Sequence, residues 1–198
     1  GRDAARKEAS KLNVPRIGVR FRLPASMNQV EYFGRGPAEN YLDRNAGSMI
    51  GLYKSTAEEL YFPYVRPQEN GHHTDTRWVS LSTGKKGLLI QADNTIGFNA
   101  LRNSIEDFDD EEATGLPRQW SNFTPEQVAN HDEAAAKNVL RRQHHINDIT
   151  PRDFVEVCVD LKQQGVAGYD SWGSRPEPAY TLPANREYNW GFTLIPLK

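Results

Sequence analysis

The sequence predicts an all-β fold arranged as an antiparallel sandwich, and three observations support this prediction. Apolar and polar residues alternate in short segments, a pattern typical of half-buried strands. These segments recur at intervals of roughly 10 to 15 residues and are separated by turns rich in Gly and Pro, as in sandwich folds. The 198 residues include four Trp, eight Tyr and eight Phe, and aromatic residues favour strands. A chain of this length suits one domain or a large part of one.

The alternation is clearest from Ile17 to Leu23, where every second residue is apolar. It returns after Asp153, where Val or Leu occupies every second position up to Leu161. Both segments are therefore predicted to be strands with one face toward the core. The other expected strands are 29–33, 76–81, 87–91, 95–101, 179–182 and 187–194.

The segments between these strands are expected to be mostly loops. Residues 38–48 are polar and rich in turn-forming types, and residues 61–71 form an extended stretch dense in aromatics with two prolines. A short helical turn is expected at 53–59. Residues 1–12 are charged and rich in Ala, so 1–13 are expected to be a flexible N-terminal segment or the boundary of an excised piece, since the sequence starts without Met.

Residues 103–147 interrupt the strand pattern. They open with an acidic cluster, 106–112, which is expected to be a solvated face rather than a cation site. Thr124, Pro125 and Gln127 then match the N-cap, N1 and N3 positions of a helix. We expect one short helix around 124–138, in an excursion from the sheet.

Composition excludes several function classes. The net charge of −2 gives no basis for nucleic-acid binding through a basic surface. The single cysteine, Cys158, excludes an internal disulfide or a cysteine-based zinc cluster. No apolar run approaches the roughly 20 residues that span a bilayer, and no apolar signal region is present, so no membrane association is expected and the compartment is not predicted.

Two pairs of histidines, His72–His73 with Asp75 and His144–His145 with Asp148, are the candidate metal ligands. Metal binding is disfavoured, because adjacent residues on a strand point to opposite faces and each pair offers one ligand to a given site. Exposed loop histidines are the expected alternative. Glycoside hydrolysis needs two facing carboxyl groups. No pattern pairs any two of the candidates, which are Glu39, Asp43, Glu69 and Asp170.

The loop from Gly165 to Gly173 leaves the strand that follows Asp153 and holds three glycines. Trp172 follows Asp170 and Ser171 near its tip. A large aromatic presented on a loop can form a flat platform for a ligand, or it can plug the end of a core. The residues alone leave both alternatives open.

Three blocks in the same order give the chain a family resemblance. The blocks are Glu31-Tyr-Phe-Gly-Arg-Gly-Pro-Ala-Glu-Asn-Tyr-Leu-Asp-Arg44, then Tyr64-Val-Arg-Pro-Gln-Glu-Asn-Gly71 with Asp75 and Arg77-Trp78, and finally Leu161-Lys-Gln-Gln-Gly165 with Asp170-Ser-Trp-Gly173. From about Val14 onward the chain closely resembles the C-terminal domain of β-galactosidases of glycoside hydrolase family 2.

The resemblance implies a partial antiparallel supersandwich domain, similar to galactose mutarotases, over residues 14–198. It also implies an insertion at 107–137. The catalytic glutamates would lie in a separate TIM-barrel domain with magnesium and sodium nearby, so this chain would hold no catalytic residue, no metal ligand and no cofactor of its own. The implied partners are that barrel, a galactoside substrate and further copies of the enzyme in a homo-oligomer.

The resemblance assigns Trp172 to substrate stacking, with Asp170 and Ser171 in support. A second group is expected to form a structural network that holds loops in place. Its members are Arg35, Glu39, Asn40, Tyr41, Asp43, Arg44, Glu69 and Asn70.

The expected function is therefore that of an excised C-terminal part of an enzyme that hydrolyses terminal β-galactosides, such as lactose, with retention. The part alone is expected to be inactive. Two alternatives stay open. The first is a separate small subunit of a split β-galactosidase. The second is an aldose 1-epimerase-like sugar-binding domain, for which His72, His73 and Glu69 are the available acid–base groups.

Overall fold

The computed structural model describes residues 12–65, 68–108, 146, 149–167 and 175–198. The expected helix around 124–138, the expected insertion beyond Phe108, and the loop residues Asp170, Ser171 and Trp172 lie outside the described residues. The chain divides into two compact units. The first comprises 1–62, 70–102 and 152–198, and the second comprises 63–69 and 103–151.

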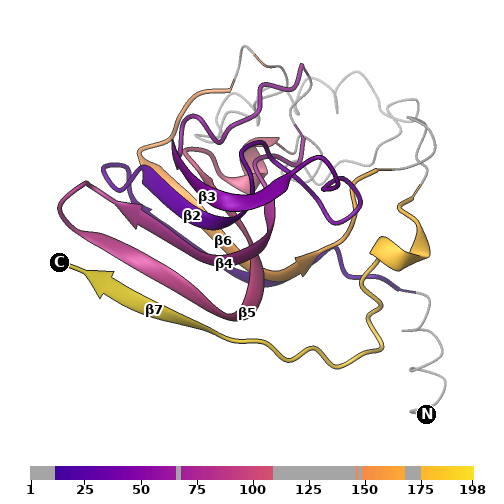
Figure 1. Ribbon diagram of the computed structural model, residues 1–198. Helices are drawn as coiled ribbons and strands as arrows, with labels where there is room; N and C mark the ends of the chain where they lie inside the picture. The colour runs from indigo at the N-terminus through magenta and orange to yellow at the C-terminus, as the bar shows by residue number, and fades with distance from the viewer. Residues whose placement is uncertain (1–11, 66–67, 109–145, 147–148, 168–174) are drawn as a thin grey trace, which may run out of the picture. The chain divides into compact units, whose positions relative to one another are not determined.

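The first unit is built on one antiparallel sheet of seven strands (Figure 1). The strand order is β1-β6-β5-β4-β2-β3, and β7 also pairs with β5. Their bounds are β1 Arg16–Pro24, β2 Gln29–Gly36, β3 Met49–Thr56, β4 His73–Ser82, β5 Gly87–Leu101, β6 Phe154–Gln163 and β7 Phe192–Leu197. The prediction of an all-β antiparallel fold is confirmed.

Strand β5 organises the sheet because it has two halves with different neighbours. Residues 87–92 pair with β7, whereas residues 97–101 pair with β6. On its other edge β5 pairs with β4, and the register shifts between Trp78–Gln91 and Thr76–Ile96. The extra residues on β5 form a bulge, which bends a strand and increases its twist. Figure 1 shows β5 turning between its two halves.

The core lies on one face of this sheet. Apolar side chains from β2, β4, β5 and β6 meet there, among them Tyr32, Val79, Ile90, Phe98 and Val157, each with an exposed fraction of 0%. Tyr32 packs edge-on against Phe98, with ring centroids 5.0 Å apart. Strand β6 is buried on both faces over residues 155–160, because Glu156, Cys158 and Asp160 are buried like the valines between them.

Four local predictions need correction. Residues 49–56 form strand β3, and only 56–60 make the helical turn expected at 53–59, with the Leu60 N–H donating to the Thr56 carbonyl. The two strands expected at 87–91 and 95–101 are one strand, β5. The strand expected at 179–182 is instead a 3₁₀ helix, η4, at Pro178–Tyr180, whose first residue is Pro. The last strand begins at Phe192 rather than Glu187, and it tolerates Pro196 because it lies at an edge of the sheet.

In the second unit, residues Ile105–Phe108 form a 3₁₀ helix, η1. The Ser104 N–H donates to the Asp107 carboxylate at 2.9 Å, and the Asp107 N–H donates back to the Ser104 carbonyl at 3.1 Å. Asp107 is buried, whereas Glu106 is exposed, so the solvated face that was expected does not include Asp107. None of the helices among the described residues has the length and apolar character that a membrane span requires.

Candidate functional site

The segment after β2 contains a tight turn that carries Asp43. Tyr41 and Arg44 exchange two backbone hydrogen bonds, of 2.9 and 3.2 Å, so Leu42 and Asp43 occupy the centre of the turn. The Tyr41 ring is buried and stacks on the His72 ring, with centroids 5.6 Å apart. The Arg44 guanidinium lies 5.0 Å from the Tyr41 ring centroid on the surface side. The turn is thus fixed by an aromatic side chain anchored in the interior.

Glu39 connects this turn to the loop that precedes β4. Its Oε2 accepts the Gly71 backbone N–H at 2.7 Å and the Tyr41 hydroxyl at 3.3 Å. Its Oε1 accepts a hydrogen bond from the Arg44 guanidinium. The Glu39 side chain is 4% exposed, and a buried carboxylate is stable only when charge and hydrogen bonds compensate for lost water. These contacts supply that compensation.

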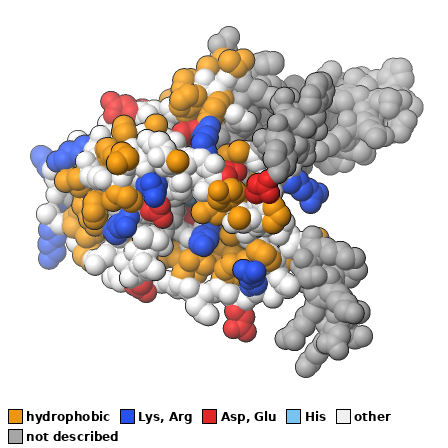
Figure 2. Space-filling view, turned by 45° about the vertical axis from the view of Figure 1, so that its right-hand side comes forward, with side chains coloured by type: hydrophobic (Ala, Val, Ile, Leu, Met, Phe, Trp, Pro, Cys, Tyr) orange, Lys and Arg blue, Asp and Glu red, His pale blue; other side chains and the backbone are white. Residues whose placement is uncertain are grey.

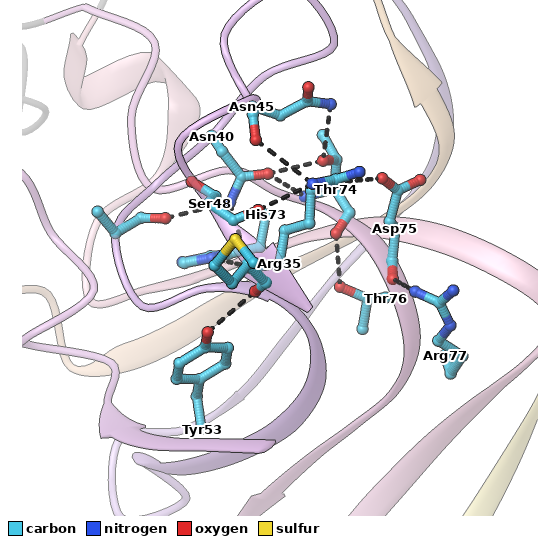
Figure 3. A network of polar contacts seen from close by, with 12 residues as sticks. Arg35, Asn40, Asn45, Ser48, Tyr53, His73, Thr74, Asp75, Thr76 and Arg77 are labelled. Carbon is cyan, nitrogen blue, oxygen red and sulfur yellow. Dashed lines mark hydrogen bonds and ion pairs between the residues drawn. The ribbon is translucent and has the colours of Figure 1, made fainter. Parts of the chain in front are cut away.

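Asn40 and Arg35 hold the same segment against the start of β4 (Figure 3). The Asn40 side chain donates to the carbonyls of Arg35 and Ala38, both at 3.1 Å, and its Oδ1 accepts from the Thr74 N–H at 2.9 Å and the Thr74 hydroxyl at 2.6 Å. Arg35 donates to the Asp75 carboxylate and to the Ser48 carbonyl. Every polar group of the Asn40 side chain is therefore used to fix backbone geometry.

Asn70 closes the loop between Phe62 and β4 in a similar way. Its Oδ1 accepts the Phe62 N–H at 2.8 Å, while its Nδ2 donates to the Phe62 carbonyl. The Asn70 carbonyl in turn accepts from the Asn99 side chain on β5. Glu69, the remaining member of the expected network, belongs to the second unit and is half-buried there.

The carboxylate of Asp43 contacts the start of the loop that follows β6. Its Oδ1 accepts the Val166 N–H at 3.1 Å, and its Oδ2 accepts the Ala167 N–H at 2.8 Å. The Gly165 N–H donates to the Tyr180 carbonyl at 2.8 Å. Two sequence blocks separated by more than 120 residues therefore meet at this point, immediately before the segment that contains Trp172.

His72 and His73 point to opposite faces of the sheet and are both buried, at 1% exposure, so the expectation of exposed loop histidines is wrong for this pair. The His72 Nδ1 lies 2.8 Å from Asn99 Oδ1, whereas the His73 ring stacks on Phe98. Burial lowers the pKa of His72 to about 3 and that of His73 to about 4. Both rings are neutral at pH 7 and neither is accessible to a sugar.

The described residues contain no cluster of three or more His, Cys, Asp or Glu side chains that could hold a metal ion. Asp75, the third member of the first candidate set, is paired with Arg35. His144, His145 and Asp148 lie outside the described residues. The His72–His73–Asp75 set therefore does not fit a bound metal ion.

Sequence reasoning missed a second polar cluster, which lies between β1, β5 and β6. Arg16 donates to the Asp160 carboxylate at 2.9 Å and to Asn99 Oδ1. Asp160 and Asn99 are buried, and His72 is adjacent, with its Nδ1 3.9 Å from Asp160. The alternating pattern predicts that Asp160 lies on the face of β6 opposite the core valines. It does not predict that this second face is also buried.

The first unit is an all-β structure on one antiparallel sheet, and its described motif residues hold loops in place. A family model described as the β-galactosidase small chain matches residues 3–194. The chain belongs to the β-galactosidase small-chain family.

Curated relatives agree with this membership. A β-galactosidase of Priestia megaterium is 35% identical over 185 residues, which cover 93% of this chain and 15% of that protein. A β-galactosidase of Vibrio cholerae is 29% identical over 91% of this chain and 14% of that protein. One of Streptococcus thermophilus is 28% identical over 93% of this chain and 15% of that protein. The chain thus spans about a seventh of the length of these relatives.

Proposed function

We propose that this chain is the C-terminal region of a β-galactosidase and that it completes the substrate pocket of that enzyme without supplying a catalytic group. The whole enzyme would hydrolyse terminal β-galactosides, such as lactose, with retention of anomeric configuration. The family match and the names of the relatives support the enzyme class. Their much greater length leaves room for the catalytic glutamates outside this chain. In this proposal, those glutamates lie in a barrel domain with magnesium and sodium ions nearby.

The observation that carries the proposal is the anchored start of the 165–173 loop. Asp43 fixes the backbone at Val166 and Ala167, and Trp172 follows five residues later in the sequence. In the proposed role, the indole face of Trp172 packs on the C–H face of the sugar, and Asp170 and Ser171 support Trp172. Aromatic stacking of this kind contributes on the order of 1 kcal/mol beyond burial.

Retention requires two carboxyl groups about 5 to 5.5 Å apart, one as nucleophile and one as acid–base catalyst. The Glu39 carboxylate accepts hydrogen bonds from Gly71, Tyr41 and Arg44. The Asp43 carboxylate accepts hydrogen bonds from two backbone N–H groups. These engagements support the proposal that the hydrolytic pair lies elsewhere in the enzyme. The contribution of this chain would be to shape the aglycone side of the pocket and to stabilise a homo-oligomeric assembly.

The substitution Trp172→Ala in the whole enzyme tests the proposed role. We expect KM for lactose to rise by about five- to tenfold, since losing about 1 to 1.4 kcal/mol corresponds to that factor, and galactosyl transfer to acceptors to slow. The melting temperature should stay close to that of the wild type. Unchanged kinetics on lactose would remove Trp172 from the substrate site.

A separate small subunit of a split β-galactosidase is a second candidate, favoured by the description of the matching family as a small chain. The reading frame upstream of Gly1 distinguishes the two candidates: a continuous frame encoding a barrel supports a C-terminal region, and a stop followed by a start codon supports a subunit. The epimerase-like alternative receives no support from the geometry, because His72 and His73 are buried on opposite faces.

A further inference from the structure

Asp43 accepts hydrogen bonds with both carboxylate oxygens from consecutive residues of one loop. The Val166 N–H donates to Oδ1 and the Ala167 N–H donates to Oδ2. Hydrogen bonds to an ionised acceptor are stronger than neutral ones, and two of them together fix an orientation as well as a distance. The carboxylate therefore determines the direction in which the chain leaves β6.

Gly165 provides a second, independent observation. A Cβ atom built on Gly165 would lie only 2.5 Å from the Asp43 Cγ, closer than any real side-chain contact. The carboxylate thus sits against the Gly165 backbone in space that any other residue would fill. The loop sequence is matched to the carboxylate at three successive positions, 165, 166 and 167.

Asp43 is itself held firmly in place. The two backbone hydrogen bonds between Tyr41 and Arg44 close its turn. The turn is fixed to the interior by the stacking of Tyr41 on His72 and by the contacts that Arg44 and Tyr41 make with Glu39. Because the 41–44 turn is held in place, the Asp43 side chain can hold the start of the 165–173 loop in a fixed position.

We propose that Asp43 is a positioning residue for the substrate loop: its carboxylate fixes residues 165–167 and thereby sets the affinity of the enzyme for the galactoside. The effect on affinity rests on the proposed function, in which Trp172, further along the same loop, contacts the sugar. The anchoring itself rests on the contacts of Asp43 alone. The two parts are tested by different measurements.

Amide hydrogen exchange on this chain tests the anchoring. Asp43→Asn keeps the shape of the side chain but replaces one acceptor oxygen with an NH₂ group, which cannot accept the backbone N–H. We expect exchange at Val166 and Ala167 to become at least tenfold faster. Asp93→Asn is the matched control, because Asp93 also lies against a glycine, Gly191, at a distant strand. Unchanged exchange at 166 and 167 in Asp43→Asn would overturn the anchoring.

Steady-state kinetics of the whole enzyme test the effect on affinity. Asp43→Asn should raise KM for lactose by about tenfold, which corresponds to about 1.4 kcal/mol, with a smaller change in kcat. Gly165→Ala should have a similar effect, because its methyl group displaces the carboxylate. Asp93→Asn should match the wild type.

A double-mutant cycle separates positioning from a general structural effect. If Asp43 acts through Trp172, the double variant Asp43→Asn/Trp172→Ala should have the KM of Trp172→Ala alone. If the increases in KM of the two single variants instead add in the double variant, Asp43 acts elsewhere and the proposal is overturned. The proposal is also overturned if Trp172→Ala raises KM and Asp43→Asn leaves it unchanged. If Trp172→Ala itself leaves KM unchanged, the proposed function fails and the affinity claim falls with it, while the exchange measurement still decides the anchoring.

Discussion

Glu39 and His73 illustrate how single buried polar residues organise this domain. Glu39 is nearly inaccessible and joins the 41–44 turn to Gly71. The His73 ring packs against the rings of Tyr32 and Phe98, and its Nδ1 lies 3.1 Å from the Arg35 carbonyl oxygen. The buried His73 ring is accommodated in its neutral form, so the stability of the domain depends on pH.

Stability should fall below pH 6.5 because of the buried histidines. Burial lowers the pKa of His73 in the folded state to about 4, against about 6.5 in the unfolded chain. Between these values the unfolded state binds more protons, so the free energy of unfolding decreases as pH falls. Lowering the pH from 7 to 5 should cost about 2 kcal/mol through His73 alone.

The variant His73→Phe isolates this effect in urea unfolding at pH 7 and pH 5. Phenylalanine can preserve the stacking on Phe98, and the Arg35 carbonyl keeps the hydrogen bond from Asn40. The loss of stability between the two pH values should be smaller by about 2 kcal/mol in the variant than in the wild type. Equal losses in both proteins would contradict the assignment.

Sequence reasoning at the residue scale succeeded where local rules apply. The opposite orientation of His72 and His73 follows from strand geometry alone and is found in the structure. The resemblance supplied Glu39, Asn40 and Asp43 as a group. It could not supply their partners, because contacts such as that of Asp43 with Ala167 link positions 124 apart.

At the scale of elements, the sequence predicts well the strands in which apolar and polar residues alternate. It does not predict well the strands that form because they pair with a neighbouring strand. Strands β1 and β6 carry clear alternation and pair with each other along their whole length. Strand β3 exists because it pairs with β2 from Gln29–Thr56 to Gly36–Met49, and its sequence is ambiguous by itself. Strand β5 runs through Asp93 and Asn94, which lie between the two strands predicted there, because the bulge opposite β4 accommodates them.

The pairing of β1 with β6 requires a glycine at position 18. The register shifts between Ile17 and Gly18, and a Cβ atom there would lie 2.6 Å from the Val159 carbonyl oxygen. Backbone atoms cannot yield as a flexible side chain can, so Gly18→Ala should lower the free energy of unfolding by about 1 to 3 kcal/mol.

Gly47→Ala is the control for this prediction, because nothing lies within 4 Å of a Cβ atom at position 47. Its free energy of unfolding should stay within about 0.5 kcal/mol of the wild type. Urea denaturation of both variants provides the comparison. A Gly18→Ala variant as stable as Gly47→Ala would show that the β1–β6 pairing tolerates a side chain there.

At the scale of the whole molecule, the surface of the domain is only partly polar. Figure 2 shows a face on which hydrophobic side chains lie in groups between scattered charged ones. Met49 and Leu52 on β3 are 70% and 59% exposed, and Leu194 on β7 is 48% exposed. Exposed apolar side chains are common on soluble proteins when scattered, but grouped ones favour contact with other protein surfaces. Contacts with other protein surfaces are expected for a chain that spans only about a seventh of the length of the relatives it matches.

An activity assay directly tests the proposal that this chain supplies no catalytic group to a larger β-galactosidase. The purified chain would be incubated with a chromogenic β-galactoside, alongside the whole enzyme and a matched blank. Hydrolysis by the chain alone should equal the blank, while the whole enzyme should be active and should lose affinity for lactose when Trp172 is replaced by Ala. Hydrolysis by the chain alone above the blank would contradict the claim, because it would place a catalytic pair within these 198 residues.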